Sequence, residues 1–372
     1  MEVKVSRASR GILLETVRRQ PSLVLLAFIL VAVPGVFAAS YVTAGSGRAS
    51  NKQPPVGTSS VTVTTASANV PQVASLAVTS AFHSALELGL AKAEHEGGHA
   101  EAAIWADNWP QPIVVGDRDQ MRLWSTAKPP TALAVMAAAR AARKPLYPQF
   151  ETWMERAFER SENCPEREMV LYLQSLAGSP LGAVNAFQNI LGQARAHANV
   201  QPIPQPPDGS ACEVTPPPWL GVLRFPLTND ALQFGTATWT IGDAIAFAHA
   251  LAIGTYGNDG RRVLALMAKP KLPSLEQSKG EFTAPYEWGA GHAFSGWKPM
   301  YKAGWGGRQH GNFMVVQYVV LLFRGHKIAI AAAFHPNQQP TKDDPGEVNA
   351  WLALEDIFLP LRTAIAHAYR AH

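Results

Sequence analysis

The chain has few charged residues and only two cysteines among its 372 residues. Charged residues make up 16% and hydrophobic residues 47%, enough apolar material for a sizeable core in one large domain or two small ones. No internal repeat is visible. The formal charge of +4 comes from residues 1–80, with seven Lys or Arg against two Glu, whereas residues 81–372 hold 25 basic and 26 acidic side chains. This lack of a basic excess over most of the chain argues against a nucleic-acid partner.

One run of the sequence has no charge at all. It extends from Ser22 to Ser40, SLVLLAFILVAVPGVFAAS, and is close to the roughly 20 residues that cross a bilayer as a helix. The basic lead over residues 1–21 predicts a cytoplasmic start, with all later residues on the outer side. An uncleaved transmembrane signal-anchor fits the long lead, and a cleaved signal peptide fits the small residues of VFAAS. We therefore expect a single-pass protein of the cell membrane, or a secreted one after cleavage.

Residues 41–72 lack acidic side chains and any helical apolar period. They are rich in Ser, Thr, Ala, Val and Gly, a composition that cannot bury enough surface to offset its ordering entropy. We expect a flexible stalk here, followed by one extracytoplasmic domain over residues 73–372.

The scarcity of cysteine excludes a disulfide-rich scaffold. Cys164 and Cys212 both fall on the predicted outer side, where an oxidising environment favours one disulfide between them. The alternative is a pair of unpaired thiols.

The order of predicted elements indicates an α+β sandwich. We expect one antiparallel sheet assembled from both ends of the domain, with an all-helical lobe inserted between them. The capping pair Thr240 and Asp243 marks one helix start. The predicted ranges are helix 73–96, strands 101–107 and 112–117, a helical region 125–200, a Pro-rich loop 201–218, a helix from 240, strands 300–305, 312–323 and 326–334, and helix 346–372.

Ser125 and Lys128, in WSTAKPP, are three residues apart at a predicted helix start. Helical residues at this spacing share a face, so the two side chains are expected to touch. A serine hydroxyl becomes a nucleophile when a neighbouring base takes its proton, and a desolvated lysine can be that base. The helix start also points N–H groups at a reacting carbonyl, which suits acyl transfer. Alternatively Ser125 is only an N-cap. Pro129 and Pro130 are expected to distort the helix.

A second motif, SENCPERE, spans residues 161–168. Ser161 is a candidate proton relay beside Ser125, and the Asn163 amide is a candidate partner for Lys128 or for a substrate amide. An ordinary helix start explains the same letters, with Asn163 as N-cap and Glu166 three residues on. Both interpretations can hold together.

A third motif, YKAGWGG, lies on a predicted strand at 301–307. Lys302 is a candidate for binding a substrate carboxylate and for lowering the pKa of Lys128. Gly304 would let a substrate backbone lie against the strand, with Trp305 at the rim of the cleft. The alternative is an exposed strand lysine followed by a Gly-rich turn.

The three motifs, in this order, resemble the penicillin-recognising serine hydrolases, which include class A β-lactamases and D,D-peptidases. WSTAKPP is similar to the active-serine segment of actinobacterial class A β-lactamase-like serine hydrolases. The matching element order covers residues 75–372. The resemblance implies that Ser125 is the acylated nucleophile and Lys128 its base, and that the backbone N–H groups of Ser125 and Trp305 form the oxyanion hole. Ser161 with Asn163, and Lys302 with Gly304, would match the second and third motifs.

The resemblance also implies the partners: a cell-wall peptide, a β-lactam or an ester. Together with the apolar run over residues 22–40, it leads us to expect a membrane-anchored monomer without a cofactor. Two departures put β-lactamase activity in doubt. Ala303 stands where the family usually has Thr or Ser, and no Glu-x-x-Leu-Asn-like segment follows the second motif to supply a deacylating glutamate. A catalytically weak protein that binds cell-wall ligands or partners is therefore the alternative.

HEGGH, from His95 to His99, fits the spacing of a zinc motif. That motif needs a continuous helix, and Gly97 and Gly98 each cost a helix about 1 kcal/mol. No third ligand is evident, so we interpret the segment as a turn and predict no metal site.

Overall fold

The computed structural model describes residues 71–116, 120–200, 237–270, 289–306, 313–338 and 346–370. The chain divides into a unit of residues 1–66 and a unit of residues 67–372, and every described residue belongs to the second. Segment 22–40, the predicted stalk as far as residue 70, the Pro-rich loop and Cys212 lie outside the described residues, so those predictions stay predictions. Within the described part of the chain, no helix is long and apolar enough to cross a bilayer.

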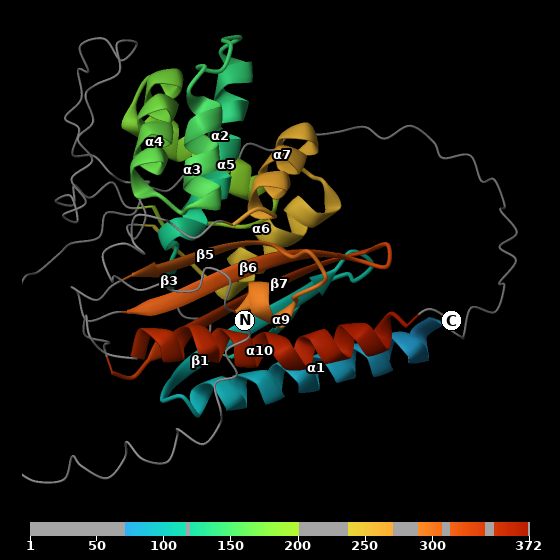
Figure 1. The fold of residues 1–372 in the computed structure, drawn as a ribbon. Coiled ribbons are helices and arrows are strands. Elements are labelled where there is room, and N and C mark those ends of the chain that lie inside the picture. Colours follow the sequence, from blue (N-terminus) through green and yellow to red (C-terminus); the bar gives the residue numbers. More distant parts are fainter. Residues whose placement is uncertain are drawn as a thin grey trace, which may run out of the picture. The chain divides into compact units, whose positions relative to one another are not determined.

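A five-stranded antiparallel sheet forms the centre of the domain, in the order β2-β1-β7-β6-β5 (Figure 1). Two of its strands come from the start of the domain and three from its end, as the sequence predicted. The strands are β1 (Gly98–Ala106), β2 (Ile113–Val115), β5 (Met300–Gly306), β6 (Met314–Phe323) and β7 (His326–Pro336).

The turn between β6 and β7 fixes the register of the C-terminal hairpin. Phe323 pairs with His326, so only Arg324 and Gly325 connect the strands. Both have positive φ, 51° and 85°. Two successive left-handed residues match the right-handed twist of the flanking strands, which explains the tight two-residue connection.

Helices cover both faces of the sheet (Figure 1). Helices α1 and α10 lie together on one face, and α6 lies on the other beneath the inserted lobe of α2–α5 and α7. The helices are α1 (Pro71–Glu94), α2 (Lys128–Ala141), α3 (Phe150–Glu159), α4 (Asn163–Ala177), α5 (Pro180–Gln193), α6 (Ile241–Ile253), α7 (Gly257–Met267), α9 (Ala290–Ala293) and α10 (Gly346–Ala368), with a 3₁₀ helix η2 (Trp124–Ala127) before α2.

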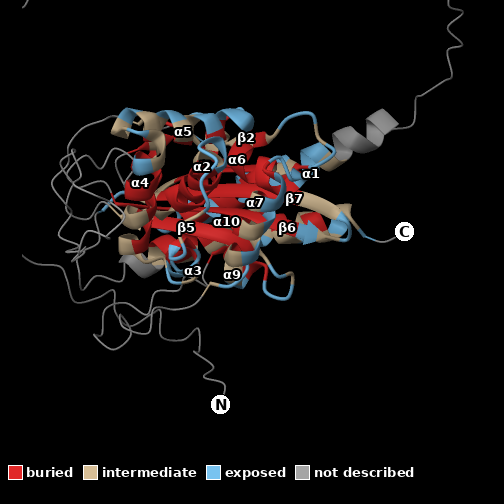
Figure 2. Cartoon of the chain, turned by 90° about the horizontal axis from the view of Figure 1, so that it is seen from above, coloured by how far each residue is buried: buried red, intermediate tan, exposed pale blue. Residues whose placement is uncertain are grey.

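Burial follows this layering (Figure 2). One apolar cluster joins the lobe and α6 to the sheet, and a second joins α1 and α10 to its other face. Helix α6 is apolar on nearly all sides, IGDAIAFAHALAI, as expected for a helix packed between a sheet and a lobe. The predicted α+β class and the inserted helical lobe are thus confirmed.

Thr240 and Asp243 form the predicted capping box at the start of α6. The Asp243 backbone N–H donates to Thr240 Oγ1 at 3.1 Å, and Asp243 Oδ2 accepts from the Thr240 backbone N–H at 2.9 Å. Thr240→Ala is therefore expected to lower the free energy of unfolding by about 1 kcal/mol. Urea unfolding followed by circular dichroism measures this. Thr255→Ala, at an exposed loop position, is the control and should change little; equal losses in both variants would contradict the assignment.

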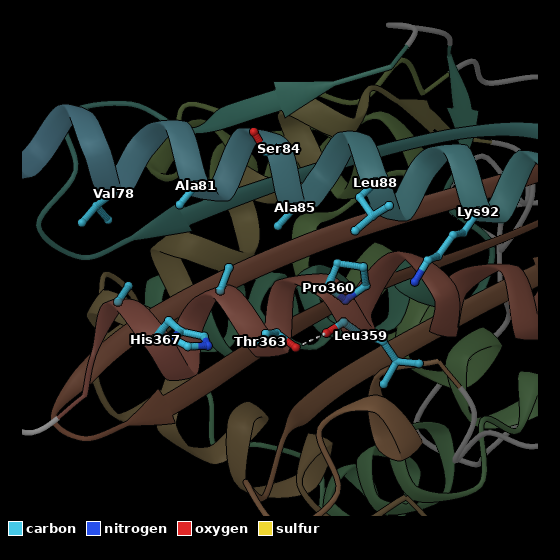
Figure 3. Close-up of a pocket in the computed structure, with 12 residues that line it drawn as sticks. Val78, Ala81, Ser84, Ala85, Leu88, Lys92, Leu359, Pro360, Thr363 and His367 are labelled. Carbon is cyan, nitrogen blue, oxygen red and sulfur yellow. Dashed lines mark hydrogen bonds between the residues drawn. The ribbon is translucent and has the colours of Figure 1, made fainter.

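An apolar groove of about 710 Å³ lies between α1 and α10 (Figure 3). Small and aliphatic side chains line most of it, with Lys92 and His367 among the polar ones. None of its lining residues belongs to the three sequence motifs, so it is separate from the site around Ser125.

Candidate active site

Ser125 and Lys128 meet at a change of helix type. Ser125 belongs to η2, and Lys128 begins α2. In a 3₁₀ helix, residues three apart are eclipsed rather than merely on one face. This places Lys128 Nζ 2.7 Å from Ser125 Oγ, and the lysine is fully buried.

The prediction that the two prolines distort the helix is wrong. Pro129 and Pro130 occupy its first positions, directly after Lys128. Backbone N–H groups there have no intrahelical acceptor, so their loss costs no hydrogen bond. The prolines are thus compatible with a regular helix that begins beside Ser125.

The backbone before Ser125 is strained and closely packed against β5. Trp124 has φ of 44°, which is unfavourable for a large side chain. A Cβ at Gly304 would lie 2.9 Å from the Leu123 carbonyl oxygen and 3.0 Å from Ser125 N, and one at Gly306 would lie 2.6 Å from the Trp124 ring. The two glycines of β5 therefore let the strand lie against the turn that carries Ser125.

Gly304→Ala is expected to slow any acylation of Ser125 by about 100-fold, because it pushes β5 and η2 apart by a sizeable fraction of an ångström. Gly192→Ala on α5 is the matched control, since no atom lies within 4 Å of its added Cβ. Labelling by an active-site probe, with the thermal midpoint measured in parallel, separates a local effect from unfolding. Normal labelling of the Gly304 variant would show that the close approach is unnecessary.

The second motif forms the turn between α3 and α4. Ser161 has φ of 55°, a left-handed conformation that turns its carbonyl oxygen toward Lys128 Nζ at 2.7 Å. Its hydroxyl lies 3.4 Å from the same nitrogen. Glu162 holds the turn from the outside, because its carboxylate accepts from Arg156 Nε at 2.8 Å.

Asn163 faces the site rather than capping the helix. Its Oδ1 accepts from Lys128 Nζ at 3.1 Å, while the N-cap of α4 is Glu162, without a side-chain capping bond. The alternative interpretation of Asn163 as N-cap is therefore wrong, because its side chain binds the lysine. The predicted pairing of Cys164 with Cys212 stays a prediction.

Lys302 reaches the same cluster from β5. Its Nζ lies 2.8 Å from Ser161 Oγ and 3.1 Å from the carbonyl oxygen of Ala303, and only 3% of the residue is exposed. Burial lowers the pKa of Lys302 well below its ordinary value, and the charge of Lys128 lowers it further, whereas Glu166 raises it. Ser161 thus connects two buried lysines through one hydroxyl.

The surroundings of Lys128 suit both of its protonation states. The Ser161 carbonyl oxygen and Asn163 Oδ1 can only accept, so they bind two N–H groups. At the third position of the nitrogen, Ser125 Oγ lies closer, at 2.7 Å, than the Ser161 hydroxyl, at 3.4 Å. A neutral amine presents its lone pair there, and an ammonium presents its third N–H. A proton can therefore move from Ser125 to Lys128 without rearrangement of the other contacts.

Trp305 differs from its predicted place. Its side chain packs against the apolar cluster on the α1 and α10 face of the sheet, not at the rim of a cleft beside Ser125. The reason is strand alternation: Lys302 faces the lobe, so residue 305, three positions on, faces the other way. The predicted role of its backbone N–H remains a proposal.

Sequence reasoning missed two parts of the site. Glu166 is fully buried, with Oε2 3.8 Å from Lys128 Nζ, although the sequence indicated only a capping role for it. A two-stranded sheet of β3 (Met121–Arg122) and β4 (Thr238–Trp239) precedes η2 and α6. Strands of two residues are too short to show an alternating apolar pattern in the sequence. Glu166 could have been found, because it lies one helical turn after Asn163 and therefore on the same face of α4.

The histidine segment forms a turn, as expected. Helix α1 ends at Glu94, and β1 begins at Gly98, so His95 and His99 do not share a helix. In the described ranges, no group of three candidate ligand side chains is placed to hold a metal ion.

Known proteins match this chain in structure only. No protein-family model and no curated protein matches its sequence. A β-lactamase from Sphaerobacter thermophilus is 16% identical, with 77% of this chain and 98% of that chain covered and a TM-score of 0.49. A β-lactamase from Streptosporangium roseum is 15% identical, with 74% of this chain and 97% of that chain covered and a TM-score of 0.47. An ancestral class A β-lactamase of Gram-negative bacteria is 15% identical, with 75% of this chain and 99% of that chain covered and a TM-score of 0.45. All three are β-lactamases by name.

Proposed function

We infer that this protein is a serine hydrolase that works through an acyl-serine intermediate. One observation supports this most strongly: Lys128 Nζ, fully buried, lies 2.7 Å from Ser125 Oγ, and two oxygens that can only accept hold its other positions. Burial of a lysine ammonium costs free energy because the charge loses its contact with water. A buried lysine placed against a serine hydroxyl therefore fits the activation of a nucleophile.

In the first half-reaction, Ser125 Oγ forms a bond to the substrate carbonyl carbon, and its proton passes to Lys128 Nζ. The carbonyl electron pair moves to oxygen, and the backbone N–H groups of Ser125 and Trp305 are the candidate donors for that oxyanion. The bond from carbon to the leaving nitrogen or oxygen then breaks. The leaving atom takes a proton from the lysine pair through the Ser161 hydroxyl, which lies within 3.4 Å of both amines.

In the second half-reaction, water attacks the ester carbon, the bond to Ser125 Oγ breaks, and a water proton returns to Ser125. The products are the free acid and the original enzyme. The substrate class that fits is an amide or ester of a cell-wall peptide, a β-lactam or a simple ester. We propose a membrane-anchored enzyme, or a secreted one, that acts outside the cell as a monomer.

A second candidate is a protein that binds such ligands but turns them over poorly, because no Glu-x-x-Leu-Asn-like segment follows the second motif to supply a deacylating glutamate. Ala303, the other departure from the family pattern, packs in the apolar cluster on the α1 and α10 face of the sheet, so its side chain faces away from Ser125. We expect such a protein to be acylated at Ser125 but to hydrolyse the acyl-enzyme slowly.

Intact mass spectrometry over time, after mixing with a penicillin or an activated ester, separates the two candidates. A hydrolase gives an adduct that forms and disappears while product accumulates beyond one equivalent. A weak relative retains its adduct: an activated ester then releases one equivalent of its leaving group and no more, and a penicillin, whose leaving nitrogen stays in the acyl group, releases no product. The absence of both adduct and product on folded protein would contradict acyl-serine chemistry.

A further inference from the structure

A buried carboxylate lies beside the two lysines. Glu166, on the first turn of α4, has no solvent exposure, and its Oε2 is 3.8 Å from Lys128 Nζ, which is equally buried. Glu166 takes no part in the two half-reactions of the proposed hydrolase. Burial of a charged group costs free energy unless an opposite charge or hydrogen bonds compensate for it, so a buried carboxylate must affect the charge of the lysine beside it.

The cluster contains two amines and one carboxylate. If both lysines were charged, one positive charge would remain unmatched among three buried side chains. With one neutral amine, the cluster holds one ammonium and one carboxylate and is neutral overall. The direction of the pKa of Lys302 agrees, since burial and Lys128 lower it and Glu166 opposes them.

We propose that Glu166 is a positioning residue whose carboxylate stabilises the ammonium that forms on Lys128 when the Ser125 hydroxyl gives up its proton. The inference rests on the proposed function. No bond to Glu166 forms or breaks: the proton moves from Ser125 Oγ to Lys128 Nζ, and the carboxylate lowers the free energy of the charge created there. A neutral side chain of the same shape would make Lys128 a weaker base.

Two titratable groups face Lys128. Glu166, on α4, lies against its Nζ, and Lys302, on β5, binds the Ser161 hydroxyl that also contacts it. The other charged side chains in the described elements that pack against α2 are partly or fully exposed. On the same helix as Glu166, Arg167 and Glu168 follow at partly buried positions. Ion pairs engage several of these exposed or partly exposed charges, among them Arg140 with Asp259, Arg262 with Glu151, and Arg156 with Glu162.

The first test is the pH dependence of phosphonylation by an alkyl fluorophosphonate, measured as intact mass against time. In this reaction Ser125 Oγ bonds to phosphorus, fluoride leaves, and the serine proton goes to Lys128, so the rate rises with pH as the base becomes neutral. In Glu166→Gln the midpoint of this rise should fall by about one to three pH units, because an opposite charge within about 4–6 Å has that effect. A purely structural role would lower the rate but leave the midpoint unchanged.

Two variants sharpen the test. Glu168→Gln makes the same chemical change two residues along α4 and should leave the midpoint in place. Glu166→Asp keeps the charge at a greater distance, so its midpoint should fall between those of wild type and Glu166→Gln. It also keeps the proposal testable if Glu166→Gln does not fold. A midpoint unmoved in both Glu166 variants, with wild type labelled normally, overturns this inference and leaves the proposed function intact.

Lysine side-chain NMR gives a readout that needs no catalysis. Signals of Lys128 and Lys302 can be assigned through Lys128→Met and Lys302→Met. In Glu166→Gln the titration midpoint of the pair should fall by about the same one to three pH units. If wild type is never labelled, the proposed function fails; the NMR titration still decides whether Glu166 stabilises the ammonium, and an unchanged midpoint there overturns the inference.

Discussion

Replacement of Ser125 by alanine is expected to abolish covalent labelling by an alkyl fluorophosphonate, with a rate at least about 10³-fold below that of wild type. The hydroxyl is the atom that forms the new bond, and Lys128 Nζ lies 2.7 Å from it. The fold should persist, since Ser125 is partly exposed and its removal leaves the lysine with its two carbonyl-type partners. Intact mass after a fixed exposure measures the loss.

Two serine variants serve as comparisons. Ser84→Ala, at an exposed position on α1, should label like wild type. Ser161→Ala keeps the nucleophile but removes the hydroxyl that connects the two lysines, so it should label more slowly than wild type and still carry its adduct on Ser125. Labelling of Ser125→Ala at the wild-type rate would mean that the probe reacts elsewhere.

The second large effect is expected from Lys128→Met. Methionine has a similar length but no nitrogen, so Ser125 loses its base and labelling should slow by about 10²–10⁴-fold. Rates at several pH values measure this, and in the variant the rise with pH that reflects the lysine should disappear.

The control for this substitution is Lys92→Met, an exposed lysine on α1. Removal of Lys128 also leaves Glu166 buried without its ammonium, which lowers stability, so labelling is compared well below the thermal midpoint of each variant. If Lys128→Met reacts within about threefold of wild type, the base is another group.

The sheet and the motif order could be predicted because their signals are local. Strands 300–305, 312–323 and 326–334 are apolar runs separated by turn residues, and the structure places β5, β6 and β7 within a few residues of those limits. The Thr240 cap is equally local. Each of these elements is decided by a few consecutive residues.

The details of the site depend on tertiary contacts that no short stretch encodes. Asn163 suits an N-cap by composition, but binding a buried ammonium competes for its side chain and prevails. The positive φ of Ser161 follows from its carbonyl binding Lys128, which lies 33 residues away in the sequence. Strand alternation counted from Lys302 was sufficient to place Trp305 on the opposite face, and that signal was overlooked.

The central claim is that folding brings the Ser125 hydroxyl and a proton-accepting Lys128 into contact in a buried cluster. Peptide sequencing of the fluorophosphonate adduct tests it most directly, with native protein compared against protein unfolded in urea. A single adduct on Ser125 in the native protein, absent after unfolding, is the predicted result. An adduct on any other residue, or equal labelling of Ser125 in the unfolded chain, would contradict the claim.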